Sequence, residues 1–230
     1  MPDYAATRDR VEHYFDRTAT KTWERLTSDA PVSGVRATVR AGRDKMRALM
    51  LAQLPEDLRG ARILDAGCGT GAMAVELAGR GADVVAVDIS PALVGIAEKR
   101  MPANLAGHIT WVAGDMLEAT HGRFDHALAM DSMIYYTAPD IASVLGRAAP
   151  RINGKFIFTL PPRTPALMAM WRVGKLFPRA DRSPTMIPQT TPGVAQALRD
   201  ASVKGRLAEV ERVKSGFYIS TALVFEGAKR

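Results

Sequence analysis

The stretch Arg62-Ile-Leu-Asp-Ala-Gly-Cys-Gly-Thr-Gly71 decides the fold of this chain. Ile63 and Leu64 are typical of the end of a buried strand, residues 65–71 predict a tight turn, and a helix is expected over 72–79. The glycines of this turn let the backbone bend sharply and approach a ligand, because no Cβ stands in the way. A glycine-rich turn between a strand and a helix predicts a nucleotide-like ligand.

The acid inside this turn narrows the choice of ligand. The turn alone would suit a dinucleotide or a phosphate group. However, Asp65 lies within the turn, and no Gly-Lys-Ser/Thr follows to hold phosphates. A carboxylate there would repel a pyrophosphate but attract the ammonium group of an amino acid. The combination favours S-adenosylmethionine (SAM), which has a methionine end and no phosphate.

Two further acids follow the next expected strands. A strand over 83–88 ends in Asp88, about twenty residues beyond the glycines, where an acid hydrogen-bonds ribose hydroxyls. A third strand over 109–115 ends in Asp115, which would accept from the adenine amino group. Ligands in parallel sheets sit at the carboxyl ends of the strands, where these acids fall.

The spacing of strands and helices predicts a parallel sheet. A fourth strand is expected over 124–131 and a fifth over 155–159, and helical stretches at 72–79 and 91–101 separate the first three strands. Over residues 60–160 the chain resembles the class I SAM-dependent methyltransferases. A dinucleotide-binding domain, or a fold that has lost its ligand, remains an alternative.

The expected cofactor contacts combine the glycine turn, the strand-end acids with their neighbours, and residues of an N-terminal arm. They are Tyr14, Arg40, Arg43, Asp65, Gly67, Cys68, Gly69, Thr70, Gly71, Asp88, Ile89, Ser90, Gly114, Asp115, Met116, Met130, Asp131 and Ser132.

Length and composition bound the organisation of the chain. Its 230 residues suffice for one sizeable domain with additions, and 47% hydrophobic with 24% charged residues is typical of a soluble globular protein. The single cysteine excludes an internal disulfide and fits a reducing cytoplasm. We expect neither a signal peptide nor a membrane span, because no apolar run is long enough. The net charge of +7 suits nucleic acid, anionic substrates or an anionic membrane surface, and does not choose among them.

Residues 1–55 are expected to form a helical arm that covers the cofactor site, followed by the catalytic domain over 56–230. Helices are predicted over 9–18 and 43–54. Arg40 and Arg43 would bind the SAM carboxylate, since a guanidinium binds a carboxylate through two parallel hydrogen bonds. A solvated helix face is the alternative for both arginines.

An unusual insertion follows the fifth strand at 161–192, and prolines bracket a short helix that carries methionine, tryptophan and cations. Such a segment would cover a large, flat, apolar ligand with acid groups, although it would also suit a membrane surface or a cover for the sheet. The expected substrate contacts are Arg163, Met168, Trp171, Arg172, Lys175 and Arg179. Two strands at 205–213 and 215–226 are expected to close the sheet as a hairpin.

The turn after the fourth strand points to an oxygen acceptor. Amide and base nitrogens are commonly served by an Asn/Asp-Pro-Pro-aromatic turn, whereas Met130-Asp-Ser-Met-Ile-Tyr-Tyr136 has no proline. A carboxylate acceptor is ionised at neutral pH and needs no strong base. Tyr135 and Tyr136 would hold it by phenolic hydrogen bonds, or would simply be packing groups. The four histidines are scattered, so no metal site is expected.

The whole chain resembles the magnesium-protoporphyrin IX O-methyltransferases of bacteriochlorophyll biosynthesis. The resemblance is carried by Tyr14-Phe-Asp16, Trp23-Glu-Arg-Leu-Thr-Ser-Asp-Ala-Pro-Val-Ser33, Thr38-Val-Arg-Ala-Gly-Arg-Asp44, Leu64-Asp-Ala-Gly-Cys-Gly-Thr-Gly71, Asp131-Ser-Met-Ile-Tyr-Tyr136 and Met170-Trp-Arg-Val-Gly-Lys-Leu-Phe-Pro-Arg179.

This resemblance implies a Rossmann-like α/β fold with a mostly parallel seven-stranded sheet and an antiparallel C-terminal edge, an N-terminal helical arm, and a lid insertion after strand five. It also implies that SAM methylates one propionate of magnesium protoporphyrin IX. The large subunit of magnesium chelatase would deliver the porphyrin, and the cytoplasmic enzyme would attach loosely to the photosynthetic membrane. Related enzymes of oxygenic phototrophs have a histidine at the position of Tyr135 and a tyrosine at that of Thr27, so roles assigned to those side chains do not transfer.

Two rival functions remain open from the sequence. A quinone or phenol O-methyltransferase would need a base for its acceptor, and no His–acid pair is evident. A non-catalytic carrier of SAM or a tetrapyrrole would have the same sheet and would differ only in turnover. A nucleic-acid methyltransferase is disfavoured by the missing proline turn.

Overall fold

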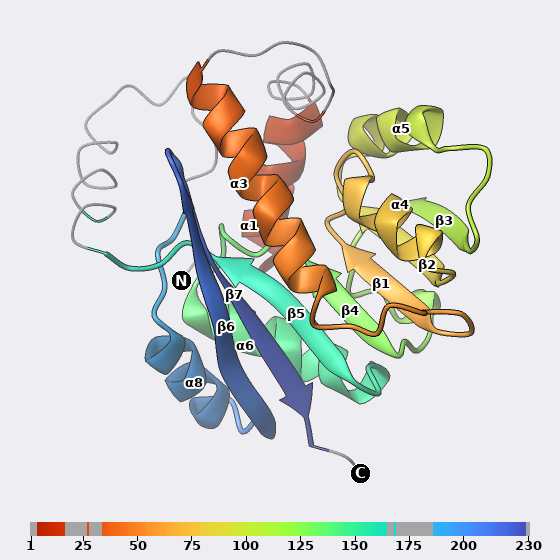
Figure 1. The fold of residues 1–230 in the computed structure, drawn as a ribbon. Coiled ribbons are helices and arrows are strands. Elements are labelled where there is room, and N and C mark those ends of the chain that lie inside the picture. The colour runs from red at the N-terminus through yellow and green to blue at the C-terminus, as the bar shows by residue number, and fades with distance from the viewer. Residues whose placement is uncertain (1–3, 17–26, 28–33, 165–167, 169–185, 229–230) are drawn as a thin grey trace.

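The computed structural model describes residues 4–16, 27, 34–164, 168 and 186–228 (Figure 1). Within these ranges the chain forms one seven-stranded sheet in the order β3-β2-β1-β4-β5-β7-β6. The first five strands run parallel, while β7 is antiparallel to both β5 and β6. Their bounds are β1 Arg62–Ala66, β2 Asp83–Asp88, β3 His108–Ala113, β4 His126–Ala129, β5 Lys155–Leu160, β6 Gly205–Ser215 and β7 Tyr218–Gly227.

Helices cover both faces of this sheet, as expected for strands that are buried on both sides. One face packs against α3 and α4, whose apolar residues share a core cluster with Ile63, Val84 and Leu128. The opposite face packs against α6 and α8. The helix bounds are α1 Tyr4–Tyr14, α3 Gly34–Leu51, α4 Ala72–Gly79, α5 Pro91–Arg100, α6 Ala138–Ala148 and α8 Thr191–Asp200, with short 3-10 turns at Ala119–His121 and Ala149–Arg151.

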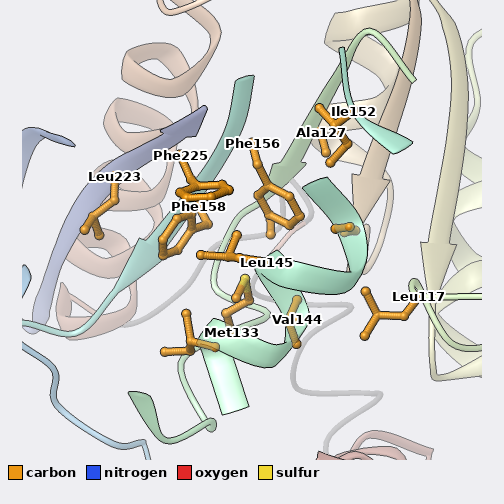
Figure 2. Packing of buried hydrophobic residues seen from close by; sticks show 14 of the residues in the cluster. Leu117, Ala127, Met133, Val144, Leu145, Ile152, Phe156, Phe158, Leu223 and Phe225 are labelled. Carbon is orange, nitrogen blue, oxygen red and sulfur yellow. The ribbon is translucent and has the colours of Figure 1, made fainter. Parts of the chain in front are cut away.

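The core beneath α6 is built largely from phenylalanines on neighbouring strands (Figure 2). Phe156 and Phe158 are two residues apart on β5, so their side chains point to the same face of the sheet. Their rings meet edge to face with centroids 6.0 Å apart. Phe225 lies opposite Phe156 on β7. Each fully buried side chain of this size contributes on the order of 2–3 kcal/mol through removal from water. This cluster makes the antiparallel hairpin part of the same rigid core.

Local capping fixes the two segments that leave the cofactor edge of the sheet. Ser90 accepts a hydrogen bond from the Leu93 amide at 3.3 Å and so begins α5 directly after β2. Thr137 and Asp140 form a reciprocal capping box at the start of α6. Such caps are each worth about 1 kcal/mol. The box also ends the loop over 130–136, which carries both tyrosines proposed to meet the acceptor.

The predicted fold is confirmed, with differences at element ends. The predicted helix over 43–54 coincides with the second half of α3 but ends earlier, at Leu51. α3 begins at Gly34, and no proline interrupts residues 34–42. The predicted helix over 9–18 begins earlier, at Tyr4, and ends at Tyr14. β3 ends at Ala113, so Asp115 lies in the following loop rather than on the strand. No helix among the described residues is long and apolar enough to cross a bilayer.

Candidate active site

A cavity of about 380 Å³ lies at the carboxyl ends of the parallel strands. Its walls come from the turn after β1, the ends of β2 and β4, and the helices α1 and α3. Most of the residues predicted to bind a cofactor or acceptor line it: Arg40, Arg43, Asp65, Gly67, Cys68, Gly69, Thr70, Asp88, Ile89, Gly114, Asp115, Met116, Met130, Asp131, Ser132, Tyr135 and Tyr136.

The glycines of the turn after β1 have the sharp bends that the sequence predicted, but the prediction that Asp65 lies within the turn was wrong. β1 extends to Ala66, because Asp65 pairs with Ala86 of β2 and Leu128 of β4. Gly67 and Gly69 have φ values of 81° and 55°, in the left-handed region that glycine adopts without strain. A Cβ on Gly67 would overlap the side chain of Ser132, so the turn and the loop after β4 are in close contact. A Cβ on Gly69 would meet no atom within 4 Å, because this glycine faces the open cavity.

Asp65 is a buried acid with an unsatisfied oxygen. Its side chain lies in the cavity wall at 1% exposure, and its Oδ2 has no hydrogen-bond partner among the described residues. Burial raises its pKa to about 7, and the nearby charge of Asp88 adds to the shift, while a backbone hydrogen bond from Ala74 opposes it. An orphaned carboxylate oxygen in this position needs a cationic donor. It therefore fits the ammonium group of a bound SAM.

Asp88 braces the glycine turn and also faces the cavity. Its Oδ2 accepts from the Gly69 amide at 2.8 Å, and its Oδ1 accepts from the Ser90 amide at 2.9 Å. Burial is the main cause of its raised pKa. A carboxylate has about four acceptor positions, so this side chain retains capacity for ribose hydroxyls. Ser90 also hydrogen-bonds Asp16, which ties the end of α1 to the same corner.

Asp115, in the loop after β3, connects that loop to α1. Tyr4 donates from its hydroxyl to Oδ1 at 2.6 Å, and Arg8 donates to Oδ2 at 3.3 Å. The Tyr4 ring stacks on Tyr136 with centroids 5.2 Å apart and planes inclined by 21°. Burial and the bond to Asp115 raise the pKa of Tyr4. α1 thus covers this end of the cavity, through residues that the sequence did not indicate.

Three arginines of α3 line the cavity at helical spacing. Arg40, Arg43 and Arg47 fall three and four residues apart and therefore share one face. Arg43 forms an ion pair with Asp131 in the loop after β4. Arg47, which the sequence analysis missed, bonds Asp44 at 2.8 Å and Glu76 of α4 at 2.5 Å. The periodicity of the arginines was the signal that could have found it.

The two tyrosines of the β4 loop have different surroundings. Tyr135 packs with Val11, and its ring meets that of Phe15 at 6.4 Å with planes inclined by 62°. Tyr136 lies under Tyr4, and burial with the charge of Asp115 raises its pKa. Tyr135 therefore borders the apolar part of the cavity, whereas Tyr136 borders the acidic end.

Some predicted site residues lie elsewhere. Tyr14 makes an edge contact with Phe15 outside the cavity lining, Gly71 packs against the ring of Trp111, and Ser90 caps α5. Arg163 lines a separate hollow of about 150 Å³ beside Gln189. Met168 is half-buried. The predicted contacts outside the described residues are Trp171, Arg172, Lys175 and Arg179. Within the described part of the chain, no group of three or more His, Cys, Asp or Glu side chains has metal-ligating geometry.

Comparisons with known proteins agree with this architecture. Residues 129–226 match the family model for the magnesium-protoporphyrin IX methyltransferase C-terminus, and residues 63–152 match a methyltransferase domain. A solved structure of magnesium protoporphyrin IX methyltransferase from Synechocystis PCC 6803 with bound SAH (S-adenosylhomocysteine) superposes with a TM-score of 0.79 at 24% identity. The match covers 96% of this chain and 100% of that one. At this identity the superposition establishes the fold.

Sequence relatives extend the match beyond the fold. The magnesium-protoporphyrin O-methyltransferase of Rhodobacter capsulatus is 54% identical over 227 residues, which is 98% of this chain and 99% of the relative. The enzyme of the same name from Synechocystis is 27% identical over 217 residues, or 93% of each chain. The resemblance drawn from the sequence is thereby confirmed. The chain belongs to the magnesium-protoporphyrin O-methyltransferase family and has the fold of the SAM-dependent methyltransferases.

Proposed function

We propose that this protein transfers the methyl group of SAM to one propionate carboxylate of magnesium protoporphyrin IX in bacteriochlorophyll biosynthesis. The products are the monomethyl ester and S-adenosylhomocysteine. The observation that carries the choice of substrate is the 54% identity, over nearly the full length of both chains, to the enzyme of Rhodobacter capsulatus. The cavity supports the choice of cofactor, because one oxygen of the buried Asp65 has no hydrogen-bond partner among the described residues, and an ammonium group would supply both a donor and an opposite charge.

Residues on two sides of the cavity would hold the cofactor. Asp65 would accept from the ammonium group, Asp88 from the ribose hydroxyls and Asp115 from the adenine amine. Arg40 and Arg43 would bind the carboxylate of the methionine part from the arm. SAM, when bound, supplies a methyl group on a positively charged sulfur that is open to in-line displacement.

The acceptor needs positioning rather than deprotonation. A propionate has a pKa near that of glutamate, about 4.3, and is ionised at neutral pH. The chain must hold this carboxylate behind the methyl group and exclude water from it. We assign this to the hydroxyl of Tyr135, a buried residue that lines the cavity beside Val11 and Phe15. Tyr136, stacked on Tyr4 beside Asp115, would support the loop from the adenine side.

Thr27 belongs to the same wall. It lines the cavity, and its hydroxyl accepts from Arg100 at 3.1 Å. Because its side chain is short, it cannot supply the ring that a tyrosine would place there. Tyr135 is accordingly the phenol that we expect to meet the acceptor.

The insertion over 161–192 would cover the macrocycle, with Arg163 and Met168 among its contacts. Its described ends pair with each other, since the Arg163 amide donates to the Gln189 carbonyl at 2.9 Å. They also attach to the loop that carries the tyrosines: Ile187 donates to the Ile134 carbonyl at 2.8 Å, and the Gln189 side chain donates to the Tyr136 carbonyl at 3.1 Å. These bonds support a substrate role for the insertion.

We propose that the chain consists of an N-terminal arm and a catalytic domain. Residues 1–55 would act as the arm that covers the cofactor, and 56–230 as the catalytic domain. Within the arm, α1 and α3 both contribute cavity residues, and Met46 and Met50 of α3 are fully buried against the sheet. The arm is therefore bound to the catalytic domain by a shared core.

We also propose a cytoplasmic location, with peripheral attachment to the photosynthetic membrane and delivery of the porphyrin by the large subunit of magnesium chelatase. An insoluble macrocycle favours direct transfer between proteins, and a net charge of +7 favours anionic surfaces. Flotation with anionic vesicles, compared with neutral ones, tests the membrane part. Co-purification with the chelatase subunit tests the other.

The catalytic proposal is tested by incubating the protein with methyl-labelled SAM and magnesium protoporphyrin IX, with metal-free protoporphyrin and a quinol in parallel. We expect label in the magnesium porphyrin and an Asp88→Ala control without turnover. Label in the quinol alone would support the rival O-methyltransferase, and binding of porphyrin without any turnover would support a carrier.

A further inference from the structure

The loop after β4 contains an aspartate whose carboxylate is held from three other elements. Arg43 of α3 forms an ion pair with Asp131. Tyr218 of β7 donates to Oδ1 at 3.1 Å, with Oδ2 at 3.4 Å. Thr159 of β5 donates to Oδ1 at 3.1 Å and accepts from the Asp131 amide at 2.8 Å. The carboxylate is thus fixed by both strands beside it and passes that constraint to Arg43.

The surroundings make this network rigid. Asp131 has φ 57°, a left-handed conformation that aspartate tolerates better than most residues. Its side chain is 10% exposed and that of Arg43 is 20% exposed, while Thr159 is fully buried. A largely buried ion pair is maintained only when its remaining hydrogen-bonding capacity is satisfied. Tyr218 and Thr159 provide that satisfaction.

Tyr218 also contacts the backbone of the arm. A Cβ on Gly42, the residue before Arg43, would lie 2.7 Å from a carbon of the Tyr218 ring. The Tyr218 ring can therefore pack against α3 only because residue 42 is a glycine. A hydrogen bond from the Ser215 hydroxyl, at the end of β6, to the Thr38 carbonyl of α3 at 2.9 Å also holds α3 against the hairpin.

We propose that Tyr218 is a positioning residue for the cofactor, acting through Asp131 to hold the Arg43 guanidinium in the cavity wall. The proposal rests on the proposed role of Arg43 toward the SAM carboxylate. An arginine side chain loses considerable rotamer freedom when it is fixed, so an arginine held in advance binds a carboxylate more tightly. In this way the C-terminal hairpin contributes to cofactor affinity, although the described residues of β6 and β7 do not line the cavity.

Tyr218→Phe tests this, since it removes the hydroxyl and keeps the ring against Gly42. We expect about five- to twenty-fold weaker binding of S-adenosylhomocysteine by calorimetry. This is at the lower end of the roughly 10- to 160-fold effect of losing a hydrogen bond made directly to a charged group, because Thr159 still holds Asp131. The KM for SAM should rise by a similar factor, with kcat nearly unchanged. Thr221→Val is the matched control: Thr221 is buried on the same strand, and its hydroxyl accepts from Arg212 at 3.2 Å, outside the cavity. This control should leave affinity unchanged.

A double-mutant cycle separates positioning from simple packing. If Tyr218 acts through Arg43, then adding Tyr218→Phe to an Arg43→Lys protein should change affinity by less than about twofold. The same fold-loss in both backgrounds would overturn the proposal, as would unchanged binding in Tyr218→Phe or in Arg43→Lys. Asp131→Asn, which keeps the size and the tolerance of φ 57°, should weaken binding on the order of 50-fold.

These measurements stay informative if the acceptor is wrong. Binding of S-adenosylhomocysteine involves no porphyrin, so a failed porphyrin assay with coupled binding would reject the substrate and keep the positioning role. Normal porphyrin methylation, together with independent effects of the Tyr218 and Arg43 substitutions on binding, would keep the substrate and reject the positioning role. Thermal melting followed by circular dichroism verifies that each variant is folded. Thr159→Val, which removes the second hydroxyl that donates to Asp131, replaces Tyr218→Phe should that protein not fold.

Discussion

The two sides of the cavity are built in different ways. One side consists of acids at the carboxyl ends of three successive strands: Asp65 within the last residues of β1, Asp88 at the end of β2 and Asp115 in the loop after β3. The other side brings together α1, α3 and the loop after β4, and the hairpin supports that loop from behind through Tyr218. The first side is local in sequence, and we propose that it binds the ammonium, ribose and adenine parts of SAM. The second is assembled by the fold, and we propose that it binds the SAM carboxylate and the acceptor.

The same residue type serves opposite purposes on the two sides. Asp65 is buried, and one of its oxygens has no partner within the described part of the chain, so it can accept a hydrogen bond from a ligand cation. Asp131 has its carboxylate bound by Arg43, Tyr218 and Thr159, so it serves the structure around it. An unpaired carboxylate oxygen thus indicates a ligand-binding role for Asp65, whereas the fully bonded carboxylate of Asp131 indicates a structural one.

The largest effect should come from Asp88→Ala, on the acidic side. The change removes the ribose acceptor and also the brace on the Gly69 amide. Loss of two hydrogen bonds to a charged group predicts on the order of 100-fold weaker binding of S-adenosylhomocysteine. Calorimetry measures this, with circular dichroism as the fold control. Unchanged affinity would refute the ribose assignment.

Tyr135→Phe tests the other side and should separate binding from chemistry. We expect kcat to fall by about 10- to 100-fold, as for loss of one positioned hydrogen bond in a transition state. Affinity for S-adenosylhomocysteine should stay the same, since Tyr135 borders the acceptor region. Full activity in steady-state assays would make Tyr135 a packing residue. Weakened cofactor binding would show that Tyr135 contacts the cofactor rather than the acceptor.

The pH dependence of binding should identify Asp65. Because burial raises its pKa to about 7, the acid is increasingly protonated below that pH and attracts an ammonium group less. Affinity for S-adenosylhomocysteine should therefore rise with pH by up to about tenfold per unit below 7 and level off above it. Asp65→Asn should bind weakly, with a flat profile between pH 5.5 and 7.5. A steep profile in that variant would assign the titration to another group, such as Asp88.

The same shift has the opposite sign for the stability of the unliganded protein. A raised pKa contributes stability that is complete below the unfolded value near 3.8 and is lost as the pH rises through about 7. Melting temperatures of the unliganded protein, compared with Asp65→Asn across this range, provide an independent check of the assignment.

Tyr4→Phe should have the smallest effect. It removes the hydroxyl that bonds Asp115 at 2.6 Å but keeps the ring stacked on Tyr136. We expect about threefold weaker binding of S-adenosylhomocysteine, because Arg8 and the Leu117 amide still hold the carboxylate. A loss as large as that for Asp88→Ala would mean that α1, rather than the strand ends, controls the cofactor.

The sequence predicted the acidic side well because its signals are local. The glycine turn and the acid at each strand end can be recognised from the local sequence alone. In the structure, Asp65, Gly67 and Asp88 all line one cavity. Even there, β3 ended before Asp115, since strand ends depend on pairing with a neighbour. The family resemblance was confirmed by the 54% identity over 98% of the chain and by the family model that matches residues 129–226.

The other side could not be predicted residue by residue. Tyr218 meets Asp131 across 87 positions of sequence, and Tyr4 meets Asp115 across 111, and no pattern in one segment indicates its partner in the other. Both contacts exist because the hairpin and α1 pack beside strands whose order is not the order of the chain. Arg47 could have been found, since it continues the helical spacing of Arg40 and Arg43.

The central claim, methyl transfer to a carboxylate, is tested most directly by the chemistry of the product. Labelled methyl groups transferred from SAM to magnesium protoporphyrin IX can be treated with mild alkali, which hydrolyses esters and leaves ethers and methylamines intact. The account predicts that the label is released as methanol, in proportion to the monomethyl ester formed. Label that remains on the porphyrin after this treatment would contradict it.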